Sequence, residues 1–317
     1  MTTWLNGATT ERSNLAAWGM IAVILVVDFV WLVFSPVSIV WVSLAGPLLV
    51  GMALAFAARL YRVRRNEPRL ADVLDVVGQM VAFMSAGALL SYLAASLAFP
   101  EQDALFHALD RRLGLDWLAY LNFVNARPAL GLAFSIAYSS FIPQVVIVLV
   151  ALGFSGRGDA ARVMLLAMMI SGLVCIAISA FMPALAMFVH LGLTPADYPN
   201  LAPAASFVHV ADIAALRSGA PVTIDLSKAE GIITFPSYHA ALGLLLLLAA
   251  LAHPWLRWPF LLLNLTMIAA TPIDGGHYFV DVVAGLLIAA AAHGLALWLL
   301  VARARAASGD GFLAKPA

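Results

Sequence analysis

The sequence predicts an all-α membrane protein, a polytopic bundle of about eight transmembrane helices, and three observations support this fold class. Hydrophobic residues make up 63% of the 317 residues and charged residues only 11%, whereas soluble domains carry roughly 25% charged residues. Apolar runs long enough to cross a bilayer, which takes about 20 residues per helix, recur along the whole chain. Two of these runs open with short polar signatures, which indicate where a functional site lies.

The apolar runs give the predicted spans in chain order. They are Ala16–Phe34, Ile39–Ala58, Val73–Phe99, Ala129–Phe154, Val163–Val189, Thr234–Leu251, Trp258–Ala270 and His277–Val301. We expect residues 1–71 to form two additional helices and a basic loop, residues 72–301 to form a six-helix catalytic core, and residues 302–317 to form a tail. An even number of spans places both ends of the chain on one side of the membrane.

The basic residues assign the two sides. Twelve of the 17 Lys and Arg residues fall on segments that share one side: Arg12, Arg59, Arg62, Arg64, Arg65, Arg69, Arg157, Arg162, Arg257, Arg303, Arg305 and Lys315. The other side holds Arg111, Arg112, Arg127, Arg217 and Lys228. Because cytoplasmic loops carry the excess of Lys and Arg, we expect both termini in the cytoplasm. The abundance of Arg, Ala and Leu hints at a bacterial protein, and the plasma membrane is the expected location.

Two connections on the predicted external side are too long to be simple turns. In the first, residues 100–128, apolar residues recur every three or four positions, which is typical of an amphipathic helix lying in the membrane interface. The second, residues 190–233, leads directly into the signature at Phe235. A long loop beside a candidate site often acts as a lid or binds substrate.

The two signatures each begin a helix. Residues 235–239 precede the run Ala240–Leu251, and residues 275–281 precede the run Val282–Val301. The chain between His239 and His277 is long enough to cross the bilayer once and return, so both helix starts face the same side. Helix N-termini carry partial positive charge and bind anions. The sequence therefore predicts an anion-binding site at the external face.

The side chains of the signatures suit acid–base and nucleophilic chemistry. His277 and Asp281 are four residues apart at a helix start and share one face, so the carboxylate can fix the imidazole tautomer and leave the other nitrogen free to attack. His239 can approach from the second helix as an acid or base. Ser237 can cap its helix or bind an oxyanion, and Gly276 permits close backbone approach to a ligand.

Two alternatives use the same residues. His239, His277 and Asp281 could bind a metal, as in a metal-dependent membrane hydrolase, but such a site would need further ligands, so we predict no metal and no cofactor. An anion or lipid transporter would use the polar groups without covalent chemistry, and it would show inverted repeats and broken helices, which the sequence does not indicate. The formal net charge of zero argues against a nucleic-acid partner.

The signatures resemble a known family. Pro236 to His239, followed by the pair His277 and Asp281, resembles the second and third motifs of the type-2 phosphatidic acid phosphatase superfamily. That superfamily includes lipid phosphate phosphatases, and vanadium haloperoxidases are more distant relatives. The wording of both motifs is closest to the branch that includes inositol phosphorylceramide synthases. The resemblance covers the six spans from about Val73 to Val301.

The resemblance implies a two-step phosphoryl transfer without a metal. By position, His277 would be the nucleophile that becomes a phosphohistidine, and Asp281 would orient it. His239 would protonate the leaving alkoxide, and Ser237 would bind a phosphate oxygen. The implied substrate is a lipid phosphate in the surrounding membrane, and the final acceptor is either water or an alcohol.

The sequence departs from the family pattern in its cations. The Ser-Arg pair that usually precedes the third-motif histidine is replaced by Ala270 and Thr271, and the first motif, Lys-x6-Arg-Pro, is absent: Tyr120 stands seven residues before Arg127. A transferring phosphoryl group still needs cationic help. Arg217 and Lys228, in the loop before the first signature, are the candidates.

Overall fold

The computed structural model of the chain describes residues 7–205 and 207–308, and most of them are α-helical. The predicted all-α polytopic bundle is confirmed. The last part of the predicted tail, residues 309–317, lies outside the described residues, whereas residues 302–308 continue the final helix.

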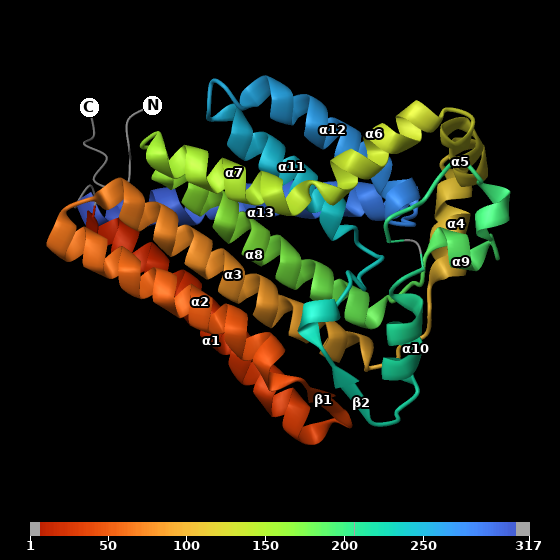
Figure 1. Cartoon of the computed structure of the whole chain (residues 1–317), viewed down its shortest axis with the longest axis horizontal. Helices are drawn as coiled ribbons and strands as arrows, with labels where there is room; N and C mark the ends of the chain where they lie inside the picture. Colours follow the sequence, from red (N-terminus) through yellow and green to blue (C-terminus); the bar gives the residue numbers. More distant parts are fainter. Residues whose placement is uncertain (1–6, 206, 309–317) are drawn as a thin grey trace, which may run out of the picture.

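The long helices run side by side along the bundle (Figure 1). They are α1 (Gly7–Phe34), α2 (Trp41–Leu60, continued by a π-helix at Tyr61–Arg65), α3 (Pro68–Ala95), α8 (Gly158–Phe181) and α13 (Phe279–Ser308). The helices α6 (Pro128–Ser139) and α7 (Phe141–Phe154) form a pair bent by 54° at Ser140. The shorter helices α11 (Tyr238–Leu251) and α12 (Arg257–Asp274) complete the bundle.

All eight predicted spans coincide with helices, but the helices differ in how well they suit a bilayer. Within the described residues, five helices are long and apolar enough to cross a membrane, or six if the bent pair α6–α7 counts as one span. The sixth and seventh predicted spans correspond to α11, with 14 residues, and α12, with 18. The expected eight spans are thus five full helices, one broken helix and two shorter ones.

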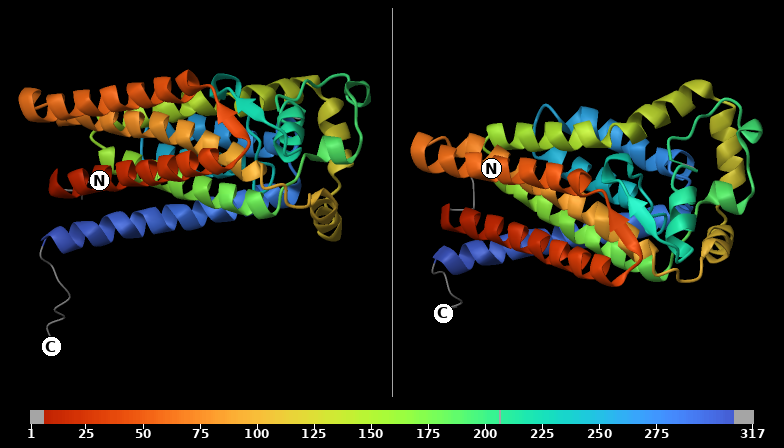
Figure 2. Two further views of the ribbon diagram at one scale, coloured as in Figure 1. Left: turned by 90° about the horizontal axis from the view of Figure 1, so that it is seen from below. Right: turned by 60° about the horizontal axis from the view of Figure 1, so that its bottom comes forward.

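Short elements gather at one end of the bundle, which we call the site end (Figure 2). They are α4 (Asp103–Arg112), α5 (Trp117–Asn125), α9 (Met187–His190), α10 (Val210–Arg217), the 3₁₀ helices Pro195–Asp197 and Leu226–Lys228, and the strands β1 (Val37–Ile39) and β2 (Val222–Ile224). Helix α4 lies in the connection that the sequence predicts to carry an interfacial helix. The region 182–237, here called the long loop, contains α9, α10 and β2.

The two N-terminal helices pack on the rest of the bundle. Gly51 of α2 faces Gly78 of α3 so closely that a Cβ at either position would lie 2.8 Å from the other's carbonyl oxygen; small residues allow such approach between membrane helices. At the site end, β1 pairs in parallel with β2 of the long loop, with Val37 opposite Val222. The N-terminal helices therefore help to hold the loop that covers the site.

The opposite end of the bundle carries a network of ion pairs. Arg162, at the start of α8, is buried and lies 2.6 Å from Asp72 of α3, and Arg62 bridges Asp72 and Asp75 at 2.9 and 2.6 Å. Charged groups buried in this way need partners, because desolvating an unpaired charge is costly. This network fixes the start of α3 against α8, far from the site end.

Candidate active site

A cavity of about 420 Å³ lies between α3, the α6–α7 break, α8, α11 and the long loop. Its walls are mostly apolar and include Phe83, Met84, Ile142, Ile176 and Leu242. Three histidines also line it: His277 before α13, His239 in the first turn of α11, and His209 of the long loop. The cavity thus combines apolar walls with a group of imidazoles that come from three separate segments.

His277 is held in a defined tautomer. Its Nδ1 lies 2.7 Å from the backbone carbonyl oxygen of Thr234, and because a carbonyl only accepts, Nδ1 carries the proton. Nε2 is therefore the nitrogen with a free lone pair. The imidazole is only 3% exposed, and a ring with a free Nε2 lone pair can act as a nucleophile.

Asp281 has two partners. One carboxylate oxygen lies 3.4 Å from Nδ1 of His277 and 2.8 Å from the backbone nitrogen of Tyr278, whose N–H it accepts at the start of α13. The sequence places Asp281 beside His277, and the structure brings them together. The Thr234 carbonyl, however, makes the shorter hydrogen bond to the ring.

His239 lies against aromatic rings of the α6–α7 break. Its ring stacks on Tyr138 with centroids 4.3 Å apart and packs edge-on against Phe141 at 5.0 Å. The Tyr138 hydroxyl lies 3.2 Å from Nδ1 of His239. This hydroxyl is the polar partner that orients His239, and the sequence did not indicate it.

Ser237 acts as the N-cap of α11. Its buried hydroxyl accepts the N–H of Ala240 at 3.2 Å, and its own N–H donates to the carbonyl of Asp281 at 3.0 Å. Ser237 is not among the described residues that line the cavity. The hydrogen bond from the Ser237 N–H to the Asp281 carbonyl holds the start of α11 beside the start of α13, so that His239 and His277 lie at the same end of the two helices.

The two helix starts cross closely because of a glycine. A Cβ added at Gly285 of α13 would overlap the carbonyl oxygen of Ser237. Gly276 adopts a left-handed φ of 66°, which favours glycine, and its carbonyl accepts the N–H of Met187 at 2.8 Å. Gly275 lines the cavity, and a Cβ there would lie 2.6 Å from the His277 ring.

The two candidate cations lie outside the cavity wall. Arg217, 18% exposed, pairs with Glu101 at 3.5 Å and lines a separate small pocket that shares Thr234 with the cavity. Lys228 is 83% exposed and lies 3.8 Å from Asp225. No Lys or Arg is found among the described residues that line the cavity.

Two carboxylates of α4 bind the start of α13, and sequence reasoning missed both. Asp110 accepts the N–H groups of Phe279 and Val280, each at 2.9 Å. Asp103 accepts the hydroxyl of Tyr278 at 2.8 Å. The N–H groups that the sequence offered to an anion at this helix start are therefore already taken. The available signal was the position of both acids with Phe106 on one buried face of an amphipathic helix.

His209 is the third histidine of the cavity, and sequence reasoning assigned it no role. It is 3% exposed, and its Nε2 donates to the carbonyl of Leu185. Burial lowers its pKa, so it is neutral near pH 7. Nothing in the sequence distinguishes His209 from His107 and His190 as a site residue. The latter two also lie at the site end, where their ring nitrogens are 3.1 Å apart.

The arrangement of side chains bears on whether the site can bind a metal. Among the residues that the structure describes, no group of three or more His, Cys, Asp or Glu side chains is arranged to hold a metal ion. That the reaction needs no metal stays a prediction.

The fold and these residues define a polytopic membrane protein with a set of buried histidines beside a largely apolar cavity. A sequence model described as the PAP2 superfamily matches residues 104–295, from α4 to α13, and the chain therefore belongs to the PAP2 superfamily. Members of this superfamily are phosphatases or phosphotransferases, so the protein is an enzyme of that type that acts on phosphate-bearing substrates in a membrane setting. No curated protein and no solved structure matches the chain significantly.

Proposed function

We propose that the protein is a lipid-phosphate phosphatase or phosphotransferase that works through a phosphohistidine at His277. The observation that supports this most is the hydrogen bond from Nδ1 to the Thr234 carbonyl. It leaves Nε2 as the free nitrogen of a neutral imidazole that lines the cavity. His239 lines the same cavity from a second helix and supplies the acid.

The proposed reaction has two steps. In the first, Nε2 of His277 attacks phosphorus, an N–P bond forms, the P–O bond to the leaving group breaks, and His239 gives its proton to the leaving alkoxide. In the second, His239 takes a proton from water or an alcohol, whose oxygen attacks phosphorus and breaks the N–P bond. Asp281 and the Thr234 carbonyl stabilise the charge on the His277 ring during both steps.

The lining of the cavity favours a lipid and a weakly charged phosphate. Phe83, Ile142 and Ile176 provide apolar surface for acyl chains. A phosphate monoester carries nearly two negative charges, and no described lining residue is a Lys or Arg that would balance them. A phosphodiester carries only one. Together with the motif wording, this favours transfer of a phosphorylated head group to an alcohol over hydrolysis of a monoester.

The site is proposed to face the external or periplasmic side. The basic connections at Arg59–Arg69, Arg157–Arg162 and Arg257 lie at the end of the bundle opposite the histidines. The excess of positive charge in cytoplasmic loops then puts the site end outside. Labelling single cysteines in α4 and in the residue 155–157 turn with an impermeant reagent in intact cells tests this: only the α4 cysteine should react.

Trapping of the intermediate tests the mechanism. Purified protein in detergent, incubated briefly with ³²P-labelled phosphatidic acid and separately with a ³²P-labelled phosphodiester lipid, then quenched in alkali, should retain label as acid-labile, alkali-stable phosphohistidine. His277→Ala should abolish the label, and His253→Ala, which changes a half-buried histidine at the opposite end, should retain it. Turnover by the wild type without any phosphohistidine would rule out this chemistry.

Transport of a lipid or anion is the second candidate, because one observation favours it. The 54° break between α6 and α7 lies at the cavity, and broken helices form the binding sites of many transporters. Reconstituted protein that moves a fluorescent lipid phosphate across vesicles, without releasing or transferring phosphate, would support this function over catalysis.

A further inference from the structure

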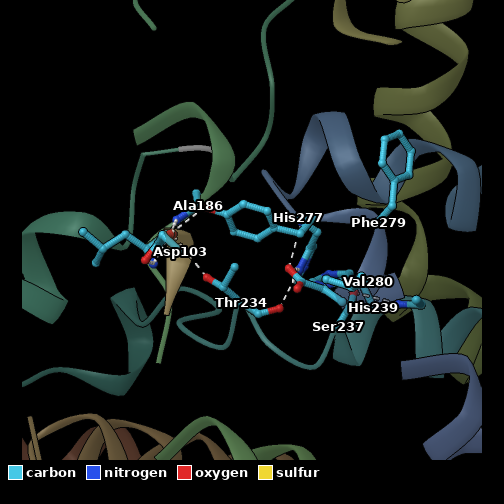
Figure 3. Close-up of polar contacts among 12 residues, drawn as sticks. Asp103, Ala186, Thr234, Ser237, His239, His277, Phe279 and Val280 are labelled. Atoms are coloured by element: carbon cyan, nitrogen blue, oxygen red, sulfur yellow. Dashed lines mark hydrogen bonds and ion pairs between the residues drawn. The ribbon is translucent and has the colours of Figure 1, made fainter. Parts of the chain in front are cut away.

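A closed ring of hydrogen bonds surrounds His277 and passes through residues outside its motif. The Nδ1–H of His277 donates to the Thr234 carbonyl, and the Thr234 hydroxyl donates to the Leu185 carbonyl at 3.2 Å. The Leu185 N–H donates to both carboxylate oxygens of Asp103 at 3.0 and 3.1 Å. The ring closes at Tyr278, whose hydroxyl donates to Asp103 at 2.8 Å and which follows His277 in the chain. Figure 3 shows Asp103, Thr234 and His277 along this line of contacts.

Asp103 is the only charged group of the ring and holds three donors at once. Besides Leu185 and Tyr278, the N–H of Ala186 approaches it at 3.3 Å. The side chain is 8% exposed, so these bonds act in a medium where they are stronger than in water. An acid is required here, because each neighbour in contact is a donor and a neutral amide would place its own N–H against one of them.

Asp110 makes similar contacts with the helix that follows His277. It lies seven residues after Asp103, which is about two helical turns along the same face of α4. It is fully buried and accepts the first N–H groups of α13 at Phe279 and Val280. Carboxylates stabilise the partial positive charge of a helix start. Helix α4 therefore binds both the long loop, whose Thr234 carbonyl accepts the His277 N–H, and helix α13, which follows His277.

We infer that Asp103 is a positioning residue for His277. It acts through the Thr234 carbonyl and the Tyr278 hydroxyl, so that α4 is the element that fixes the nucleophile. This inference rests on the proposed function of His277. It assigns the orientation of the imidazole to a helix more than 160 residues earlier in the chain, in addition to Asp281. The physical basis is preorganisation: a displacement of about 1 Å in a reacting group can cost about 100-fold in rate.

The test compares Asp103→Asn and Tyr278→Phe with a matched control. Tyr278→Phe removes one hydroxyl and keeps the ring that packs 5.8 Å from Phe106. Asp116→Asn is the control, because Asp116 is an exposed acid of the same connection and hydrogen-bonds no member of the ring. Asn keeps the oxygen that caps α5, so the contact of Trp117 with the His277 carbonyl is preserved. We expect kcat to fall about 10- to 100-fold in Asp103→Asn, with KM within about twofold, a smaller fall in Tyr278→Phe, and no change in Asp116→Asn. Wild-type kcat in both site variants would overturn the inference.

A structural readout separates this inference from the proposed function. With ¹⁵N-histidine labelling, and with His277 assigned by comparison with His277→Gln, the wild type should show the Nδ1–H tautomer. Asp103→Asn should shift His277 toward a tautomer mixture, while Asp116→Asn should not. This result holds whether or not the protein turns over a lipid, so absence of activity would reject the function alone. An unchanged His277 signal in Asp103→Asn would reject the positioning role alone.

Two milder variants test the inference if Asp103→Asn destabilises the protein, and a double variant tests whether Asp103 and Tyr278 act together. If Asp103→Asn lowers the melting temperature strongly, Tyr278→Phe and Asp103→Glu carry the test, because both keep most of the contacts. Groups in one network are non-additive: the double variant Asp103→Asn/Tyr278→Phe should lose about as much kcat as Asp103→Asn alone. Multiplication of the two single losses would show that Asp103 and Tyr278 act separately and would contradict the ring.

Discussion

The carbonyl oxygen of Thr234 lies 2.7 Å from Nδ1 of His277, closer than the 3.4 Å that separates this nitrogen from the Asp281 carboxylate. The main acceptor for the proposed nucleophile is thus a backbone group of the long loop, in the residue immediately before the Phe235 signature. Order in this loop and reactivity at His277 are thereby linked, because the loop cannot move away without releasing the ring.

Asp281→Asn should lower kcat by about 100-fold. In other His–carboxylate pairs such a change costs up to about 10⁴-fold, chiefly through the wrong tautomer. Here the Thr234 carbonyl keeps the proton on Nδ1, so the loss should be at the small end, whereas His277→Ala should remove turnover entirely. Steady-state kinetics on both variants measure this. A loss near 10⁴-fold would mean that Asp281 alone sets the tautomer.

His239→Ala should affect substrates according to their leaving group. A general acid matters most when the leaving alkoxide is basic. We expect at least about a 100-fold loss with an alkyl phosphate and a much smaller one with p-nitrophenyl phosphate. Tyr138→Phe, which removes the hydroxyl 3.2 Å from Nδ1, should show the same pattern more weakly. Equal losses on the two substrates would exclude the acid role.

Gly285→Ala should separate α11 from α13 and reduce activity. The added Cβ would overlap the Ser237 carbonyl, which a backbone group cannot avoid without moving its helix. Gly294→Ala is the control in the same helix, since a Cβ there meets nothing within 4 Å. We expect lower kcat and a lower melting temperature for Gly285→Ala, and values at or above wild type for Gly294→Ala. Similar behaviour of both variants would contradict the close crossing.

Neither candidate cation lines the cavity, and of the two, Arg217 rather than Lys228 is the one proposed to contact the phosphate. Arg217 lines a pocket that shares Thr234 with the cavity, whereas Lys228 is 83% exposed. Arg217→Ala should lower both kcat and kcat/KM, and Arg217→Lys should recover only part, because lysine lacks the bidentate fork. Lys228→Ala should stay within about twofold of wild type. A large loss of kcat in Lys228→Ala together with wild-type kcat in Arg217→Ala would assign the phosphate contact to Lys228 instead.

The reaction should need no metal. Activity should survive dialysis against EDTA, and vanadate, which imitates a five-coordinate phosphoryl group, should inhibit by competing at the cavity. The measurement is turnover before and after chelation, with added Zn²⁺ and Mg²⁺ as controls. Loss of activity on chelation that is restored by one of these ions would favour the metal-dependent hydrolase.

Some features of the site could be predicted because they are local. His277 and Asp281 are four residues apart, and one helical turn brings such residues together regardless of the rest of the fold. The length of chain between His239 and His277 fixes the return to one face. Asp103 and Asp110 could not be assigned in this way. Their partners lie about 170 residues later, and no local spacing connects them.

The sequence by itself determined the helical class, the approximate positions of the spans and the two helix starts that carry His239 and His277, because hydrophobic length and periodicity act within one segment. Only the tertiary structure decided what surrounds the imidazoles. The Tyr138 hydroxyl comes from α6, and the Thr234 carbonyl and His209 come from two parts of the long loop. A backbone carbonyl has no residue type by which to recognise it. Their role depends on how the segments pack, and packing is a property of the whole chain.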